Sequence, residues 1–297
     1  MKQERIEATK SLNPVRSVVF LVVALLFPLL TGCETTAERL DREADRGGLN
    51  RQVYEGCDYR HLVYQRSMPG NRIFVFIEGD GKPWVDGRFV AADPTPRETL
   101  AFDLMLQSDV PAVYIGRPCY FGISSQMCDP IDWTHARFSE KIVRSMDAVI
   151  TELIANDKER SIVLIGYSGG AALAMLLAPR ISRVEAVVTV AGLLDTEAWT
   201  GYHGYEPLSG SLNPADADLP NHTHQIHIIA EQDDIVPPSI SRNAIARWPH
   251  ADVWSYENFD HACCWTQQWT KTLAQIVKTL DGTGPQRLEH IVPVKVH

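Results

Sequence analysis

The stretch that decides the fold is Ser161-Ile162-Val163-Leu164-Ile165-Gly166-Tyr167-Ser168-Gly169-Gly170, which continues into Ala171-Ala172-Leu173-Ala174-Met175-Leu176-Leu177. It predicts a buried apolar strand, a serine flanked by glycines, and a helix of small and apolar residues. This is the context in which a G-x-S-x-G turn exposes a serine hydroxyl. Gly166 and Gly170 must leave room, because such a turn holds Ser168 in a strained backbone conformation. We predict that Ser168 is a nucleophile backed by the N-terminal amides of the helix; a structural turn serine is the alternative.

The first 32 residues are predicted to be a signal peptide. A basic leader precedes the apolar run Val18–Leu30, which is shorter than the roughly 20 residues of a membrane span and matches a secretory signal. The run ends in Leu30-Thr31-Gly32-Cys33, which resembles the bacterial lipobox, so we expect lipidation of Cys33. An incidental cysteine after a plain signal peptide is the alternative. With Glu34 next, the resemblance implies a lipoprotein of the bacterial cell envelope, anchored in the outer membrane and facing the periplasm.

The rest of the chain predicts a single domain. Residues 33–51 are polar with almost no apolar periodicity, which favours a tether. Residues 52–280 are long enough for one large core, and residues 281–297 are expected to form a loose tail. The formal net charge is -9, with no basic block after the leader, so nucleic acid is excluded as an expected partner.

Six cysteines are present, and export would place them in an oxidising compartment. Cys119 and Cys128 are separated by a short loop and are the predicted disulfide, with two buried thiols as the alternative. A vicinal bridge between Cys263 and Cys264 needs a distorted peptide, which favours pairing of Cys57 with one of them.

The sequence predicts neither a metal site nor a cofactor. No C-x-x-C pair or histidine–cysteine spacing indicates structural zinc. Three histidines cluster before a predicted strand and are interpreted as its solvated face, namely His222, His224 and His227.

Strands and helices alternate along the chain. The predicted strands are Ile73–Ile77, Ala112–Ile115, the strand before Ser168, Val184–Val190, His227–Ile229 and Val253–Tyr256. The predicted helices are Ser139–Ile154 with Ser139 as N-cap, the helix from Ser168 to Leu177, and Thr266–Leu280. Short apolar strands between helices predict an α/β fold with a mainly parallel sheet covered on both faces.

A serine nucleophile needs a base to take its proton and a carboxylate to orient that base. His261 is the only histidine in the loop between the last strand and the final helix, so it is the predicted base. The stretch Ala230–Pro237 resembles a G-x-x-D-x-x-V-P turn, which places the acid at Asp233. Asp234 is the main competitor, and Asp195 is a further alternative in the loop after Val184–Val190.

The oxyanion formed by attack needs preorganised N–H donors. The Gly169 amide, directly after the nucleophile, is the first. The second should lie in Glu78-Gly79-Asp80-Gly81-Lys82-Pro83-Trp84, where the register selects the Asp80 amide. We expect the carboxylates of Glu78 and Asp80 to point into hydrogen bonds of the loop itself; the alternative is a substrate with a positive or polar group.

The predicted oxyanion loop, nucleophile turn, acid turn and histidine loop follow one another along the chain. With these motifs in this order, the chain from about Arg72 to Trp269 resembles the α/β-hydrolase superfamily. The chain departs from the usual pattern of that fold at residues 78–81, where it has E-G-D-G and the fold often has H-G-x-G. The chain is also similar to an uncharacterised group of bacterial exported α/β-hydrolases, through Ile77–Gly81, Gly116–Tyr120 and His261–Trp265. The resemblance implies a serine hydrolase and supplies no substrate.

A small-molecule or lipid-like ester or thioester is the expected substrate, because its leaving group is easier to expel than that of a peptide. The insertion 192–221 is a candidate lid or pocket wall, or else a surface excursion. Trp84 and Trp265 are candidate substrate-binding residues, or else cap the core. Two other hypotheses remain: an envelope peptidase with the same triad, and a lipid-anchored binding or scaffold protein without turnover.

Overall fold

The structure, a computed structural model, describes residues 34–283 except 124 and 158. The predicted signal peptide, the lipidation site Cys33 and residues 284–297 lie outside the described residues. Within that part of the chain, no helix combines the length and the apolar character needed to span a bilayer.

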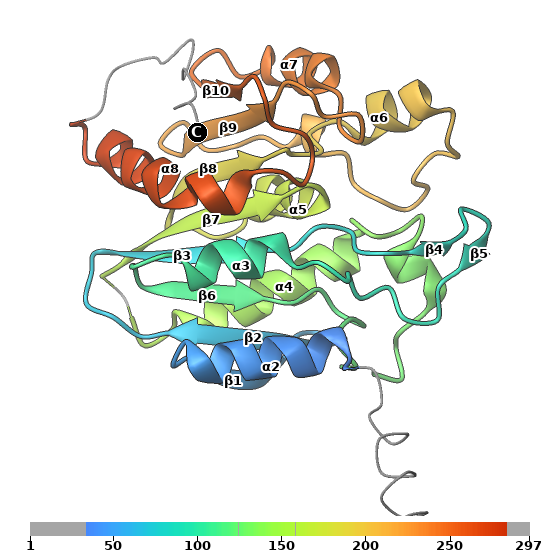
Figure 1. The fold of residues 1–297 in the computed structure, drawn as a ribbon, viewed down its shortest axis with the longest axis horizontal. Coiled ribbons are helices and arrows are strands. Elements are labelled where there is room, and N and C mark those ends of the chain that lie inside the picture. Colours follow the sequence, from blue (N-terminus) through green and yellow to red (C-terminus); the bar gives the residue numbers. More distant parts are fainter. Residues whose placement is uncertain (1–33, 124, 158, 284–297) are drawn as a thin grey trace, which may run out of the picture.

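An eight-stranded sheet forms the centre of the molecule, in the order β1-β2-β6-β3-β7-β8-β9-β10 (Figure 1). Strand β2 runs antiparallel to both of its neighbours, and the strands from β6 to β10 are parallel. A separate hairpin pairs β4 with β5. The strands are β1 (Asn50–Glu55), β2 (Arg60–Arg66), β3 (Arg72–Ile77), β4 (Trp84–Val85), β5 (Phe89–Val90), β6 (Ala112–Ile115), β7 (Ser161–Tyr167), β8 (Val184–Val190), β9 (His224–Ala230) and β10 (Asp252–Tyr256).

Helices cover both faces of this sheet (Figure 1). One face packs against α4 (Glu140–Leu153), α5 (Gly169–Leu177) and α7 (Pro238–Ile245). The other face packs against α2 (Thr36–Arg46), α3 (Leu100–Leu106) and α8 (Trp265–Leu280). The remaining helical elements are α6 (Thr196–His203) and the short 3-10 helices η2 (Pro130–Trp133) and η3 (Pro214–Asp216). The predicted α/β-hydrolase fold is therefore confirmed.

The described part of the predicted tether is folded, so that prediction is wrong for this segment. Thr35 and Glu38 form a capping box at the start of α2, which begins one residue later at Thr36. Leu40 and Ala44, one helical turn apart, are fully buried against α3 and its neighbours. Ala37 also packs against this core, so a narrow apolar stripe at i, i+3 and i+7 anchors a helix whose other residues are mostly charged.

Burial corrects the interpretation of one of the histidines in the predicted solvated strand face. His227 lies on an interior strand and is fully buried, with Nδ1 2.8 Å from the Thr189 hydroxyl, so it is no part of a solvated face. Burial lowers the pKa of His227 to about 3. His224 remains half-exposed and pairs with Asp252. Ser139 occupies the N-cap position of α4, but its side chain makes no capping hydrogen bond.

The packed state of α2 can be tested at Leu40. Leu40→Ala should lower the free energy of unfolding by about 2–5 kcal/mol, because it removes a fully buried side chain from a core. Urea unfolding measures the change. Asp45→Ala, on the exposed side of the same helix, should change it by less than about 0.5 kcal/mol. Equal, small effects of both substitutions would contradict a packed helix.

Candidate active site

The turn between β7 and α5 holds Ser168 as the sequence predicts. Its backbone φ is +52°, a strained value for a residue with a side chain. A Cβ atom at Gly166 would lie 2.3 Å from the Gly170 carbonyl oxygen, and one at Gly170 would lie 2.2 Å from that of Ile77. The turn is therefore pressed against the end of β3, and Ser168 becomes the N-cap residue of α5.

The predicted acid lies in the turn after β9. Oδ1 of Asp233 accepts hydrogen bonds from the amides of Ile235 and Val236, at 2.9 and 2.8 Å, which fixes the carboxylate. The two alternative acids lie elsewhere. Asp234 is exposed to solvent. Asp195 caps helix α6, where its side chain accepts from the Glu197 and Ala198 amides.

The predicted base lies in the loop between β10 and α8. The Asp260 carboxylate accepts from the Ala262 and Cys263 amides and so turns this loop. The carbonyl of His261 accepts hydrogen bonds from the Tyr167 hydroxyl at 3.2 Å and from Trp265 Nε1 at 3.0 Å. His261 is thus held from both sides through its own backbone.

These three elements bring Asp233, His261 and Ser168 into one hydrogen-bond relay. Nδ1 of His261 lies 2.8 Å from Asp233 Oδ2, and Nε2 lies 3.0 Å from Ser168 Oγ. A carboxylate only accepts, so Nδ1 carries the ring proton and Nε2 is left to accept from the serine hydroxyl. This arrangement can deprotonate Ser168 as it attacks a carbonyl carbon.

The loop after β3 touches the nucleophile turn. A Cβ atom at Gly79 would lie 3.3 Å from Cβ of Ser168, and one at Gly169 would lie 1.9 Å from Oδ1 of Asp80. Among the described residues, the amides of Gly169 and Asp80 have no hydrogen-bond acceptor. Both predicted oxyanion donors are therefore unpaired and lie in adjoining segments beside Ser168.

The Asp80 carboxylate points into the protein's own hydrogen bonds, as expected. It pairs with Arg117 and, at 2.7 Å, with Arg137, both of which are buried. Burial alone would raise the pKa of Asp80, but the guanidinium groups of Arg137 and Arg117 lower it below its ordinary value. The Tyr120 hydroxyl also donates to the Asp80 carbonyl at 2.8 Å. The segment Gly116–Tyr120 therefore positions the loop that carries the Asp80 amide.

Apart from the disulfide at Cys119, no role was predicted for the segment Gly116–Tyr120, so the contacts of Arg117 and Tyr120 with Asp80 were missed. The available signal was topological, because this segment follows the parallel strand β6 and so leaves the sheet at the same edge as Ser168. Tyr167 was missed as well. Its ring lies 5.2 Å from that of His261 and lines the cavity at the site.

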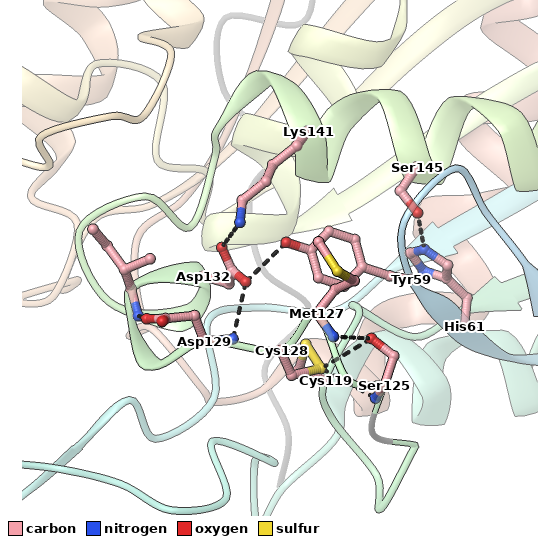
Figure 2. The surroundings of a disulfide bond; sticks show 11 residues. Tyr59, His61, Cys119, Ser125, Met127, Cys128, Asp129, Asp132, Lys141 and Ser145 are labelled. Carbon is pink, nitrogen blue, oxygen red and sulfur yellow. Dashed lines mark hydrogen bonds and ion pairs between the residues drawn. A yellow bond between two sulfur atoms is a disulfide. The ribbon is translucent and has the colours of Figure 1, made fainter.

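The predicted disulfide between Cys119 and Cys128 is present and closes the loop after β6. Figure 2 shows it beside Asp132, which accepts from the Tyr59 hydroxyl at 2.8 Å and pairs with Lys141 at 2.7 Å. These contacts tie η2, which follows the loop, to the residue before β2 and to α4. The other pairing expectation is wrong, because Cys263 is joined to Cys264 and Cys57 forms no disulfide.

Glu78, the first residue after β3, is also buried among protein groups. Its carboxylate accepts hydrogen bonds from the amides of Gly79, Ala101 and Phe102, the last two at the start of α3. Burial nevertheless raises the pKa of Glu78 to about 7. A carboxyl group that titrates near neutral pH therefore lies directly beneath the oxyanion loop.

A cavity of about 1000 Å³ opens over Ser168 and His261. Trp84 lines it from the β4–β5 hairpin, and Trp199 and Tyr205 line it from the insertion 192–221. The insertion is therefore a wall of this cavity.

Trp265 is not part of the lining: it is buried against Tyr256 and Phe259 and supports the His261 loop, which corrects its predicted substrate-binding role. The described residues contain no group of three or more histidine, cysteine, aspartate or glutamate side chains that could hold a metal ion.

The sequence profile of the dienelactone hydrolase family matches residues 110–274, which is more than half of the chain. The chain belongs to this family. It is accordingly a hydrolase of the α/β-hydrolase superfamily. No curated protein matches it.

Solved structures show the same fold at low sequence identity. The esterase Pf2001 of Pyrococcus furiosus is 14% identical with a TM-score of 0.57, covering 84% of this chain and 96% of its own. An α/β serine hydrolase homologue from Coxiella burnetii is 13% identical with a TM-score of 0.50, covering 78% and 97%. An α/β serine hydrolase without a lid from Xanthomonas campestris is 10% identical with a TM-score of 0.50, covering 79% and 93%.

Glu78 should leave a signature in the pH dependence of stability. Its pKa is about 7 in the folded protein against 4.5 as its ordinary value, so the unfolded chain loses this proton first as pH rises. Between these two values the free energy of unfolding of the wild type should fall, relative to Glu78→Gln, by on the order of 3 kcal/mol. Urea unfolding of both proteins across this range measures the difference. His61 and His227 titrate in both proteins and cancel, and two parallel curves would contradict the raised pKa.

Proposed function

We propose that the chain is a serine hydrolase that cleaves an ester or thioester through an acyl-enzyme on Ser168. The observation that carries the proposal is the unbroken relay from Asp233 through His261 to Ser168 Oγ, at 2.8 and 3.0 Å. Two unpaired amides beside the nucleophile and a cavity above it add support. The family is named after a dienelactone hydrolase, and a lactone is a cyclic ester.

The reaction would run in two halves. His261 Nε2 takes the hydroxyl proton as Ser168 Oγ attacks the carbonyl carbon, and the amides of Gly169 and Asp80 bind the oxyanion. The tetrahedral intermediate collapses when the bond to the leaving alcohol or thiol breaks, and His261 returns the proton to it. A water molecule then repeats the sequence on the acyl-enzyme and releases the acid and free Ser168.

The relay can be tested with a fluorophosphonate probe, which modifies only an activated serine. The full chain should be labelled, and Ser168→Ala should abolish labelling. Asp233→Asn should slow both labelling and hydrolysis of p-nitrophenyl butyrate by about 10⁴-fold, because the His261 tautomer is then wrong.

Asp234→Asn is the matched control for this experiment. It changes an exposed neighbour of the same type and should leave both rates unchanged. A folded wild-type chain that is neither labelled nor active would contradict the proposed function. Equal losses in the two asparagine variants would contradict the assignment of Asp233.

We also propose that the chain is exported and lipid-anchored at Cys33. The support is the apolar run Val18–Leu30 followed by Leu30-Thr31-Gly32-Cys33. Expressed in a Gram-negative host with radiolabelled palmitate, the chain should incorporate label and fractionate with the outer membrane, whereas Cys33→Ser should incorporate none. Label retained in Cys33→Ser would contradict this anchor, and Cys57→Ser is the matched control.

A further inference from the structure

Exposed large apolar side chains gather around the mouth of the cavity. Nine such side chains are exposed among the described residues, and seven belong to segments that line this opening or are hydrogen-bonded to a lining segment. We call these seven the apolar rim: Val85, Phe89, Val90, Ile131, Tyr202, Tyr205 and Ile235. Phe89 is 69% exposed and Tyr202 is 63% exposed. The other two of these nine described side chains are Val53, on β1, and Met127, in the loop that the Cys119–Cys128 disulfide closes.

Hydrogen bonds join the rim segments into one surface. Trp133 Nε1 in η2 donates to the Ala91 carbonyl beside the hairpin. His135 Nδ1, after η2, donates to the Pro207 carbonyl after α6. His203 Nε2 in α6 donates to the Ile235 carbonyl in the turn after β9. Single exposed apolar residues need no explanation, but a joined group around a cavity marks a binding surface.

The start of α2 lies at the same edge of the sheet as this rim. Strand β1 is antiparallel to β2, and β2 is antiparallel to β6, so β1 begins at the edge opposite the site. Helix α2 ends there and therefore begins at the edge of the site. Its first turns are tied to that edge, since Arg39 donates to the Arg97 carbonyl and to the Thr99 hydroxyl. Figure 1 shows the first turn of α2 on the same side as β4, β5 and α6.

We infer that the apolar rim rests on the surface of a lipid bilayer, with the mouth of the cavity opening toward the lipid. The occupant is a bilayer because Cys33 and the apolar run Val18–Leu30 immediately precede the residues that begin α2 at this edge. An anchor at that point holds the rim close to the membrane surface. The substrate is then an acyl ester dissolved in the bilayer, a step that rests on the proposed function.

The orientation can be measured without any catalysis. The full chain is reconstituted into phosphatidylcholine vesicles that contain doxyl-labelled phosphatidylcholine, with a bimane probe on a single introduced cysteine. Phe89→Cys and Tyr202→Cys report on the rim, and Val53→Cys is the matched control, all in a Cys57→Ser background because Cys57 is exposed and unpaired. Doxyl lipid should quench the probes at positions 89 and 202 severalfold and leave the probe at position 53 unchanged.

Three outcomes would overturn the inference. They are the absence of quenching at positions 89 and 202, equal quenching at all three positions, and a response of the rim probes to protein concentration instead of doxyl lipid. The last result would assign the rim to a second copy of the chain.

A catalytic comparison then tests the substrate class. Phe89→Ser with Tyr202→Ser should leave hydrolysis of soluble p-nitrophenyl butyrate unchanged and lower hydrolysis of a long-chain ester in vesicles severalfold, whereas Val53→Ser should change neither. Equal effects on both substrates would overturn the lipid-borne substrate. If the wild type hydrolyses neither ester, the proposed function fails, and the quenching experiment still decides the orientation of the rim.

Discussion

The close contact between the Ser168 turn and the end of β3 is the constraint on which the rest of the site depends. With no space for a Cβ atom at Gly166 or Gly170, the turn lies directly against the backbone of Ile77. This contact brings the Asp80 segment alongside the nucleophile. It also directs the serine hydroxyl away from the sheet, toward the loops that follow β9 and β10.

Buried charge maintains this geometry on the oxyanion side. The Asp80 carboxylate would be costly to bury alone, and two guanidinium groups neutralise it. One of them, Arg117, comes from the loop that the Cys119–Cys128 disulfide closes. On the base side the supports are hydrogen bonds to the backbone instead: the Asp260 carboxylate accepts from loop amides, and two donors bind the His261 carbonyl. The two halves of the site thus rest on different kinds of interaction.

Most of the sequence-based predictions of site residues rested on short local motifs. The positions of Ser168, Asp233 and His261 follow from patterns a few residues long, each tied to the end of a strand, and the structure brings the three together. Helix α2 was missed although Ala37, Leu40 and Ala44 recur at helical spacing, because two of the three are alanines and most of the remaining residues are charged. The role of Trp265 was equally invisible, since the choice between lining a cavity and supporting a loop depends on packing against Tyr256 and Phe259. The partners of Asp80 lie 37 and 57 residues away and could not be read from local sequence.

The separation of the site residues along the sequence bears on when the site is assembled during folding. The proposed base lies 93 residues from the proposed nucleophile and 28 from the proposed acid, and the proposed oxyanion loop follows yet another strand. Each proposed group follows a different strand, and contacts between residues far apart in sequence slow folding. We therefore expect the proposed site to be complete only after these strands have paired.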